Sequence, residues 1–533
     1  MPYEVELKLA LSPKDLRRLQ ALPWIRAMGR SAARQVLVSV YYDTEQFTLR
    51  DDGVSLRVRR IGNKRLQTVK AVGSGAPFAR REWEEEIASD KPDFACAKGT
   101  ALEPLLNKSL RRDLKPVFET RVQRTAVLIR QGKSEVELAI DRGTIKSGGH
   151  SRRISEIELE LKNGDAAALC KIAQRLSKIL PIRYGAKTKP ERGYALVEAR
   201  ESEAARGEAI VLNKNADTAT AFQTIGFSCL RHVACNEDAV RKRDAEGIHQ
   251  MRVGLRQLRA AVSIFRDILK DSQSERLNSD LKWLTDQLGP ARDYDVFLED
   301  SILPQQNSQP NRKEFGTLQS VLRKKRTAGF GKAKDVVAGE RYRRLVLRVA
   351  LWLADGKWCT SSDPLRRGGR ARPIAAFARE VLTKRTKKIV REIRNLEHLD
   401  ARRRHKLRIA IKKLRYTSEF FVSLFADAKK ERKAFGKVLE KLQSALGTLN
   451  DIQVHKHLID TIVHTQNIGQ AKSREVSLAA GLVAAQEQRN VEPLLAAATK
   501  AGKHLAKLKP CWKWRHRKKA RSQTVCEVIT FNN

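Results

Sequence analysis

Charged residues that alternate with apolar ones give the sequence its first chemical signal. In the run Glu4-Val5-Glu6-Leu7-Lys8, two carboxylates and one ammonium group lie two residues apart. Successive side chains of a β-strand point to opposite faces, so this spacing places all three charged groups on one face of a strand. Carboxylates grouped in this way can hold a divalent cation, and a neighbouring ammonium group can bind phosphate.

The same alternation recurs in five further runs of the first 200 residues. Their polar and charged members are Arg57 and Arg59; Thr68 and Lys70; Glu82, Glu84 and Glu86; Glu119 and Arg121; and Glu156, Glu158 and Glu160. Any single run fits the solvated face of an antiparallel sheet. Some runs carry only acids and others only bases, however, which suits the lumen of a closed barrel that holds cations and phosphates. Carboxylates without His or Cys favour Mg²⁺ or Mn²⁺ over zinc.

A second group of candidate residues forms a basic stripe in the C-terminal half. His249, Arg252, Arg256 and Arg259 are spaced i, i+3, i+7 and i+10, which places them on one face of an α-helix. An apolar stripe lies about 120° away around the same helix, by the 100° turn per residue. The helix can therefore bury one face and leave a cationic face open.

The basic stripe recurs later in the chain. His405, Arg408, Lys412 and Arg415 repeat the offsets, and the motif LGPARDYDVF after the first stripe is matched by LGTLNDIQVH after the second. Two motifs in the same order and at similar spacing predict an internal duplication. One basic stripe alone is the ordinary pattern of a solvated helix face. Two such faces would repel each other unless a polyanion lies between them.

Two kinds of apolar pattern predict the elements that position these residues. Eight alternating runs predict strands at 3–10, 36–42, 54–61, 66–72, 81–87, 118–129, 135–140 and 154–161. From about residue 216 to 508 the apolar period changes to 3.6, which predicts helices. Turn-forming residues concentrate at 303–312, where we expect a loop, and at 358–373, where we expect a linker.

These patterns predict a multi-domain chain. We expect an N-terminal α+β domain built on an antiparallel eight-stranded β tunnel barrel, followed by a C-terminal all-α pair of pseudo-symmetric helical bundles. The predicted boundaries are 1–200 for the tunnel domain, 201–215 for a linker, 216–508 for the helical domain, with halves of about 216–357 and 374–508, and 509–533 for a basic tail.

Composition limits the classes of partner and compartment. The net charge of +44 and the pI near 10.3 require a polyanionic partner. The seven cysteines form no CxxC pair, which argues for reduced thiols and against a zinc site. The N-terminus lacks the pattern of a signal peptide, and no segment has about 20 uninterrupted apolar residues. We therefore expect a cytoplasmic protein with a polyanionic partner.

The charged runs of the first 200 residues resemble the motifs of the CYTH family, the triphosphate tunnel metalloenzymes. The matching segments are Glu4-x-Glu6-x-Lys8, Tyr41-Tyr42-Asp43-Thr44, Ser55-Leu56-Arg57-Val58-Arg59, Thr68-Val69-Lys70, Arg81-Glu82-x-Glu84, Glu156-x-Glu158-x-Glu160, and Lys189 with Arg192-Gly193-Tyr194. The resemblance implies a tunnel barrel that hydrolyses or cyclises triphosphate compounds with Mg²⁺ or Mn²⁺.

Carried over position by position, the CYTH resemblance implies three sets of site residues. The metal ligands would be Glu4, Glu6, Glu158 and Glu160, with Glu82 and Glu84 favoured for a second metal. The phosphate-binding residues would be Lys8, Arg57, Arg59, Lys70, Arg121 and Lys189. Lys70 together with Tyr41 or Tyr42 is the candidate for activating the attacking water.

The two basic stripes and their downstream motifs resemble the CHAD family, the conserved-histidine α-helical domains. The likeness implies two pseudo-symmetric bundles with a basic groove between them that binds inorganic polyphosphate. The residues at the motif positions are His249, Arg252, Arg256, Arg259, His405, Arg408, Lys412, Lys413, Arg415 and Tyr416. The second downstream motif has Asn450 where the first has Arg292, so we expect the two copies to contribute unequally.

From these observations we expect a Mg²⁺- or Mn²⁺-dependent inorganic triphosphatase joined to a polyphosphate-binding domain. Two alternatives stay open: a polyphosphate-binding protein without turnover, and a triphosphatase or cyclase that acts on thiamine triphosphate or ATP. The expected partners are inorganic triphosphate, polyphosphate and its granules, and no membrane. The charge leaves nucleic acid open as a partner, although aromatic residues are only 6% of the chain, which disfavours a base-stacking surface.

Overall fold

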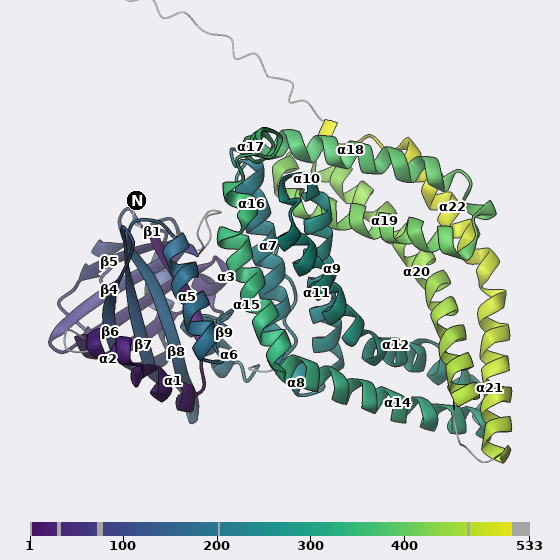
Figure 1. Cartoon of the computed structure of the whole chain (residues 1–533), viewed down its shortest axis with the longest axis horizontal. Helices are drawn as coiled ribbons and strands as arrows, with labels where there is room; N and C mark the ends of the chain where they lie inside the picture. The colour runs from purple at the N-terminus through teal and green to yellow at the C-terminus, as the bar shows by residue number, and fades with distance from the viewer. Residues whose placement is uncertain (1–2, 29–32, 72–77, 201–202, 466–469, 514–533) are drawn as a thin grey trace, which may run out of the picture.

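The chain folds into a closed β barrel and a larger all-helical part, which lie side by side in Figure 1. This computed structural model describes residues 3–28, 33–71, 78–200, 203–465 and 470–513. The architecture confirms the predicted fold class, a tunnel barrel followed by an all-α region. The last helix of the barrel part ends at Val197 and the first of the helical part begins at Thr218.

Eight antiparallel strands close the barrel. The closing strands are β1 (Tyr3–Ala10), β2 (Ala33–Asp43), β3 (Val54–Ile61), β4 (Lys64–Ala71), β5 (Ala79–Glu86), β6 (Lys115–Gln131), β7 (Ser134–Ser147) and β8 (His150–Asn163). A two-residue strand, β9 (Arg183–Tyr184), pairs with β1 in addition. Their order is β5-β4-β3-β2-β6-β7-β8-β1-β9, and β1 also pairs with β5, which closes the sheet. Each predicted run falls on one of the first eight strands; β9 was not predicted, and residue 72 of the fourth run lies outside the described residues.

The register of β1 against β8 decides which side chains face the lumen. Lys8 lies opposite Glu158, while Leu7 lies opposite Leu159. Both leucines are fully buried in an apolar cluster with α5 (Ala167–Ile179) on the outside of the barrel. Because side chains alternate along a strand, the charged partners then face inward. Burial of the outer apolar face thus fixes the charged lining of the lumen.

Short helices complete the barrel part, and α6 matters most for the lumen. The helices are α1 (Pro13–Gln20), α2 (Pro23–Met28), α3 (Thr48–Asp51), α4 (Lys108–Asp113) and α6 (Lys189–Val197). α6 begins with a capping box in which Thr188 and Glu191 satisfy each other's backbone N–H groups. A Cβ atom on Gly193 would lie 2.2 Å from the Phe118 ring, so only glycine lets α6 approach β6 this closely.

The C-terminal part consists of helices throughout. The first half contains α7 (Thr218–Cys235), α8 (Glu237–Arg241), α9 (Ala245–Ile264), α10 (Arg266–Leu269), α11 (Ser272–Gln287), α12 (Gly289–Phe297), α13 (Leu303–Ser308), α14 (Lys313–Ala338), α15 (Glu340–Asp355) and α16 (Lys357–Thr360). Next come α17 (Pro364–Ala371), α18 (Ile374–Ile393), α19 (Ala401–Phe420), α20 (Lys429–Thr465), α21 (Gln470–Arg489) and α22 (Val491–Lys507).

The two predicted stripes lie on helices of the same design. α9 and α19 are both 20 residues long, and the N-cap residues Asp244 and Asp400 accept backbone N–H groups of the first turn. Leu258 of α9 and Leu414 of α19 occupy equivalent positions in the predicted apolar stripes, and both are fully buried in one core cluster that spans the helical part. The apolar stripes are therefore core faces, as predicted.

Helices occupy two segments that we expected to be irregular. α13 covers most of the predicted loop at 303–312, α16 overlaps the start of the predicted linker at 358–373, and α17 lies within it. In α17, Asp363 caps the N-terminus and Pro364 stands in the first turn, where proline favours a helix. Turn-forming residues therefore marked helix starts at this position. Arg370 fixes α17 further by donating to the Trp358 carbonyl at 2.9 Å.

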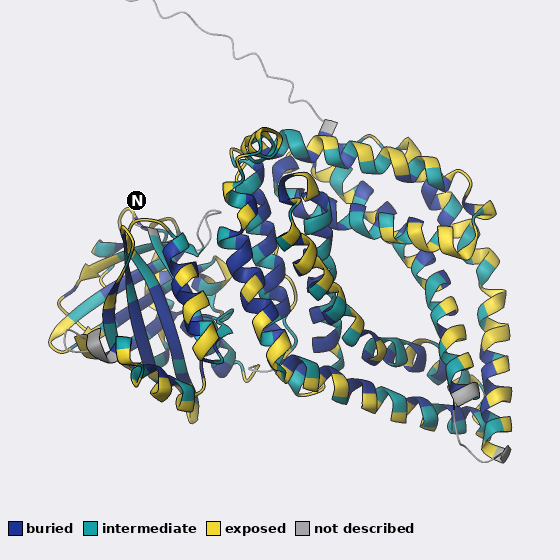
Figure 2. Ribbon diagram, viewed as in Figure 1, coloured by how far each residue is buried: buried dark blue, intermediate teal, exposed yellow. Residues whose placement is uncertain are grey.

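Helix α15 joins the barrel to the helical part. Its Leu347 and Leu351 belong to the apolar cluster under the barrel wall that includes residues of α5, and buried residues run along much of α15 in Figure 2. An ion pair of 2.6 Å between Arg231 of α7 and Glu191 of α6 adds a polar contact. The two parts therefore share a core.

The described chain stays packed almost to its C-terminal limit. Trp512 is buried, and its indole N–H donates to Thr383 at 2.8 Å. Part of the segment 509–533, predicted as a tail, thus packs against the helices, while residues 514–533 lie outside the described residues. Among the described helices, none combines the length and apolarity needed to cross a membrane.

Candidate functional site

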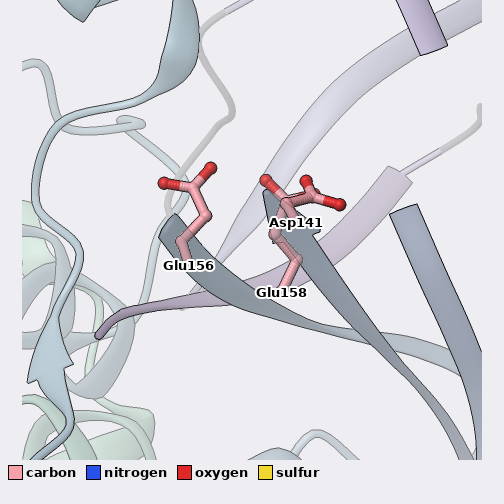
Figure 3. Close-up of side chains that lie close together, drawn as sticks. All are labelled: Asp141, Glu156 and Glu158. Carbon is pink, nitrogen blue, oxygen red and sulfur yellow. The ribbon is translucent and has the colours of Figure 1, made fainter. Parts of the chain in front are cut away.

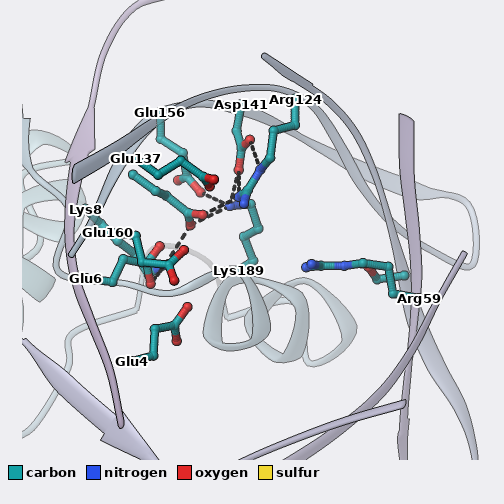
Figure 4. Close-up of polar contacts among 12 residues, drawn as sticks. Glu4, Glu6, Lys8, Arg59, Arg124, Glu137, Asp141, Glu156, Glu160 and Lys189 are labelled. Atoms are coloured by element: carbon teal, nitrogen blue, oxygen red, sulfur yellow. Dashed lines mark hydrogen bonds and ion pairs between the residues drawn. The ribbon is translucent and has the colours of Figure 1, made fainter. Parts of the chain in front are cut away.

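The barrel encloses a cavity of about 620 Å³ that is lined by side chains of all eight closing strands and by the start of α6. Most of the lining residues carry a charge. Figure 4 shows Glu4, Glu6 and Glu160 on one wall, pointing across the open space toward Arg59 on the opposite wall. The lumen therefore has an acidic wall on β1, β7 and β8 and a basic wall on β3.

The densest acidic cluster lies on β7 and β8. Asp141, Glu156 and Glu158 are buried and each offers one oxygen, with these oxygens within 4.8 Å of one another (Figure 3). Asp141 pairs directly with Glu156 in the sheet, so the strand register builds the cluster. Buried carboxylates so close together need a cation. An all-oxygen donor set fits Mg²⁺ or Mn²⁺, so the residues present suit the metal that the fold implies.

Lys189 and Arg124 supply positive charge to this acidic cluster. Lys189 Nζ lies 2.6 Å from Asp141 and 2.7 Å from Glu158. Arg124 donates twice to the Asp141 carboxylate, both times at 2.8 Å, and also contacts Glu158. Burial alone would raise the pKa of Glu158, but Lys189, Lys8 and Arg124 hold it well below its usual value. Lys189 and Arg124 therefore favour the charged form of Glu158 and already contact the oxygens that a metal would use.

Lys8 connects the cluster to Glu6. Its Nζ lies 2.6 Å from both Glu6 and Glu158. Burial and the nearby Glu158 raise the pKa of Glu6 to about 7. Glu6 is thus a lumen carboxylate that changes charge near neutral pH, and a bound cation would favour its ionised form.

Lys70 lies between two other carboxylates. Its Nζ contacts Glu4 and lies 3.1 Å from Glu82. Burial would raise the pKa of Glu4, yet Lys70 and Lys8 lower it to about 2. Burial raises the pKa of Glu82, which Lys70 opposes. The ammonium group of Lys70 is therefore held by carboxylates on both sides.

Arg57 and Arg59 form the basic wall, and their surroundings differ. Arg57 lies 3.5 Å from Glu82, and its Nε is buried without a hydrogen-bond partner in the described structure. Arg59 donates to Ser39 at 3.2 Å and forms no ion pair with any described residue. Burial and the neighbouring Arg57 lower the pKa of Arg59 to about 10. A half-buried guanidinium without a carboxylate partner among the described residues suits the binding of an anion.

Two predicted lumen residues lie elsewhere. Arg121 is exposed on the outside of β6, so its predicted place in the tunnel is wrong; Arg124, on the opposite face of the same strand, reaches the lumen instead. Tyr42 is also outside the cavity, because its hydroxyl donates to the Asp90 carbonyl at 2.8 Å. Tyr41 does line the cavity; burial would raise its pKa, but Arg57 and Arg59 lower it.

The two remaining predicted carboxylates line the cavity away from the densest cluster. Glu84 accepts a hydrogen bond from Thr68 at 2.9 Å and lies on β5. Glu160 pairs with Lys162 at 2.7 Å on β8. The structure thus brings Glu4, Glu6 and Glu158 near Lys8, and places Glu82 and Glu84 beside Arg57.

The sequence analysis did not assign Arg124, Glu137, Asp141 or Glu156 to the site, although they lie in the lumen or in the acidic cluster beside it. Asp141 and Glu137 continue the alternation of β7, but the predicted strand stopped at residue 140, one position short of Asp141. Glu156 was recognised as part of a charged face without being assigned to the metal. Extending the alternation by one residue would have found Asp141.

A second cavity, of about 990 Å³, lies between α9, α12, α19 and α20 and forms the helical groove. Eight of the predicted polyphosphate-binding residues line it: His249, Arg252, Arg256, Arg259, Arg408, Lys412, Lys413 and Tyr416. The equivalent pairs Arg252–Asp293 and Arg408–Asp451 are both 3.7 Å apart, so the two copies of the downstream motif hold the two copies of the stripe in the same way.

Positive charge in the helical groove exceeds what the described structure neutralises. The Nε atoms of Arg256, Arg259 and Arg408 are buried without a hydrogen-bond partner. Burial lowers the pKa of Lys412 to about 7, and Arg408 and Arg256 add to the effect. Like charges are therefore crowded here, and an anion would relieve the repulsion.

His405 and Arg415 do not line the helical groove. His405 is exposed, and its Nδ1 lies 2.6 Å from Asn450 Oδ1, which accepts the hydrogen bond, while Arg415 pairs with Glu419 at 2.8 Å. The structure leaves both side chains out of the groove lining, and their contact with a ligand stays a prediction. The groove face of α19 is rotated toward Lys413 and Tyr416, and this rotation makes the two halves unequal.

The fold and the two sites define a class of protein. Its members have a closed β tunnel with opposed acidic and basic walls, followed by helices around a basic groove. Comparison with known families agrees with this class: residues 2–194 match the CYTH domain and residues 224–460 match the CHAD domain. The chain belongs to the proteins in which a CYTH domain is followed by a CHAD domain.

Individual relatives match parts of the chain. An inorganic triphosphatase of Haemophilus influenzae is 30% identical over 201 residues, which cover 37% of this chain and 55% of that protein; the match spans about half of the relative. The solved CHAD domain of the plant Ricinus communis is 30% identical, covers 57% of this chain and 97% of that structure, and has a TM-score of 0.49. A Hippeastrum protein described as an adenylyl cyclase with a dominant triphosphatase activity is 15% identical, with coverages of 36% and 95% and a TM-score of 0.27.

Proposed function

We propose that the tunnel hydrolyses inorganic triphosphate with Mg²⁺ or Mn²⁺. The observation that carries the proposal is Arg59, a half-buried guanidinium without a carboxylate partner among the described residues, which faces an acidic wall across a cavity of about 620 Å³. The basic wall needs an anion and the acidic wall needs a cation. A triphosphate chain with its divalent metal supplies both. The H. influenzae relative that is named an inorganic triphosphatase supports this choice of substrate.

The lumen residues suggest a division of work. Asp141, Glu156 and Glu158, together with Glu4 and Glu6, would hold the cation. When bound, it would neutralise charge on the phosphate oxygens and orient them. Arg57, Arg59 and Lys8 would bind the phosphate chain and stabilise the charge that develops on the transferred phosphoryl group.

The tyrosine next to the basic wall is our candidate for handling the proton of the attacking water. Tyr41 lines the cavity, and its pKa is lowered by Arg57 and Arg59 against the effect of burial. Lys70 would assist Tyr41 through the positive charge of its ammonium group, which lies between Glu4 and Glu82. A group with a pKa moved toward neutrality exchanges protons more readily at the working pH.

The proposal is tested by phosphate release from inorganic triphosphate with added Mg²⁺ or Mn²⁺. Arg59→Gln should lower kcat/KM by roughly 100-fold or more, as for loss of a donor that binds a developing charge. Arg121→Gln removes the same charge from the outside of β6 and should change the rate by less than about twofold. Absence of metal-dependent release by the wild type would refute the proposal, and thiamine triphosphate and ATP as substrates would separate the two alternatives.

We further propose that the helical groove binds inorganic polyphosphate. The support is the set of buried, unpartnered Nε atoms of Arg256, Arg259 and Arg408 in a groove built from two equivalent helices. R256Q/R259Q should weaken binding by at least about tenfold, because charge-assisted contacts are lost. The control R402Q/K406Q removes two exposed cations from α19. Equal affinity for single-stranded RNA at matched charge and salt would contradict a dedicated polyphosphate site.

A further inference from the structure

We propose a second polyanion-binding groove, between the barrel and the helical part, that continues the surface of the helical groove. A cavity of about 1130 Å³ lies between α5 of the barrel and helices α11 and α15. Its cationic lining residues are Lys178, Arg276, Arg341, Arg344, Arg348 and Lys357. We call this cavity the junction groove. Its charges come from both parts of the molecule, so it exists only where the two parts meet.

A third basic stripe forms one side of the junction groove. Arg341, Arg344 and Arg348 are spaced i, i+3 and i+7 on α15, which places them on one helical face. Arginines of the helical groove have a similar spacing on α9. Leu347 and Leu351 of the same helix pack under the barrel wall, so α15 is held firmly while its basic edge borders the groove.

Acidic residues neutralise only part of this charge. Asp280 pairs with Arg341 at 3.3 Å and with Arg348 at 2.8 Å, and Glu340 pairs with Arg344 at 2.6 Å. The uncompensated charge therefore comes from Lys178, Arg276 and Lys357. Arg276 donates to the Ser272 carbonyl of its own helix, and neither Arg276 nor Lys178 forms an ion pair with a described residue. The lining holds six cationic side chains and two acidic ones. The junction groove therefore carries a net positive charge that attracts an anion.

The start of α11 is the shared wall of the two grooves. Its Ser274 and Asn278 line the helical groove, while Gln273 and Arg276 line the junction groove. Helix α15 lies between α5 and α11 in Figure 1 and contacts both. A flexible phosphate chain bound in the helical groove can therefore continue across the first turn of α11. A compact anion would occupy one groove only, so the ligand that uses both is long-chain inorganic polyphosphate.

This inference rests on the proposed binding of polyphosphate in the helical groove. The length of the polyphosphate chain distinguishes the two proposals, because only a long chain would reach both grooves. K178Q/R276Q removes two exposed cations of the junction groove and leaves the helical groove untouched. We expect the variant to lose roughly 3- to 10-fold in affinity for long-chain polyphosphate, with a shallower salt dependence, and to bind a short chain like the wild type. The control K14Q/R17Q removes two exposed cations from α1 and should bind both chains normally.

A labelling experiment adds an independent readout on the full chain. Acetylation of Lys178 and Lys357, followed by mass spectrometry, should slow when long-chain polyphosphate is added and should be unchanged by the short chain. Unchanged long-chain affinity of K178Q/R276Q, or unprotected lysines, would overturn the junction groove while the proposed function stands. A wild-type protein that binds neither chain would overturn the proposed function of the helical groove and the junction groove with it.

Discussion

Lys189 Nζ lies 2.6 Å from Asp141 Oδ2, which places an ammonium group inside the acidic cluster of the tunnel. The same Nζ lies 2.6 Å from Glu156 and 2.7 Å from Glu158. A divalent cation bound to these carboxylates would meet the positive charge of Lys189. The lysine therefore holds the cluster together in the metal-free protein and competes with metal for the same oxygens.

Replacing Lys189 by Met should destabilise the metal-free protein by about 3–5 kcal/mol, because buried carboxylates lose a cationic partner. The free energy of unfolding in urea, measured with a chelator, checks this. Added Mg²⁺ should then stabilise the variant more than the wild type, since the metal replaces the lost charge. Lys14→Met, at an exposed position on α1, should change stability by less than about 0.5 kcal/mol. If Mg²⁺ raised the free energy of unfolding equally in the wild type and in Lys189→Met, Lys189 would not compete with the metal.

Glu6 should make the stability of the metal-free protein depend on pH. Its pKa is raised from 4.5 to about 7, so between these values the folded chain keeps a proton that the unfolded chain has released. Raising the pH through this window therefore lowers the free energy of unfolding, by up to roughly 3 kcal/mol. Glu6→Gln cannot titrate and should lack this loss, whereas Glu45→Gln, at an exposed position, should keep it. Identical pH profiles for wild type and Glu6→Gln would rule the assignment out.

The two adjacent tyrosines should separate activity from stability. Tyr41→Phe should lower kcat by about tenfold or more, because Tyr41 lines the lumen beside Arg57. Tyr42→Phe should leave kcat unchanged and cost about 1 kcal/mol of stability, since the Asp90 carbonyl loses its donor. Steady-state kinetics and urea unfolding of both variants check the pair. If Tyr42→Phe lost activity and Tyr41→Phe did not, the proton-handling role would belong to Tyr42.

Polyphosphate binding should take up a proton near neutral pH. Burial, with Arg408 and Arg256, lowers the pKa of Lys412 to about 7, and bound phosphate favours the charged ammonium group. Affinity should therefore fall as the pH rises above about 7, by at most roughly tenfold per pH unit. Calorimetry in two buffers of different ionisation enthalpy measures the proton uptake. Lys412→Gln should abolish it, and Lys406→Gln, an exposed change on the same helix, should not.

Alternation along the strands made most of the tunnel predictable from sequence. The runs that hold Glu4, Arg57 and Lys70 have an apolar face that must be buried under helices, so the charged face had to point inward. The same reasoning failed on β6, where Arg121 lies outside. There the inward residues Phe118 and Val122 are apolar, because they pack against α6 inside the barrel. The sequence of one strand cannot reveal a helix that enters the lumen.

Helix periodicity located the helical groove but not its edges. Leu258 and Leu414 are buried as expected, which fixes the direction of both basic stripes within about one residue. A shift of one residue decides which side chain faces the groove. Arg415 pairs with Glu419, while its neighbour Tyr416 lines the groove. The rotation of α19 about its own axis is set by its packing against helices that are distant in the sequence. The residue pattern of α19 alone does not predict that packing.

The contribution of Leu347 and Leu351 to the barrel core bears on how this protein can be dissected. A fragment that ends near residue 200 would lack both leucines and would present the outer side of α5 to water as an unsealed apolar seam. Such a truncation would be prone to aggregate, and its inactivity would say nothing about the chemistry of the lumen. An isolated tunnel domain should therefore carry a peptide that replaces α15, or polar substitutions on the exposed apolar face of α5, before its activity is measured.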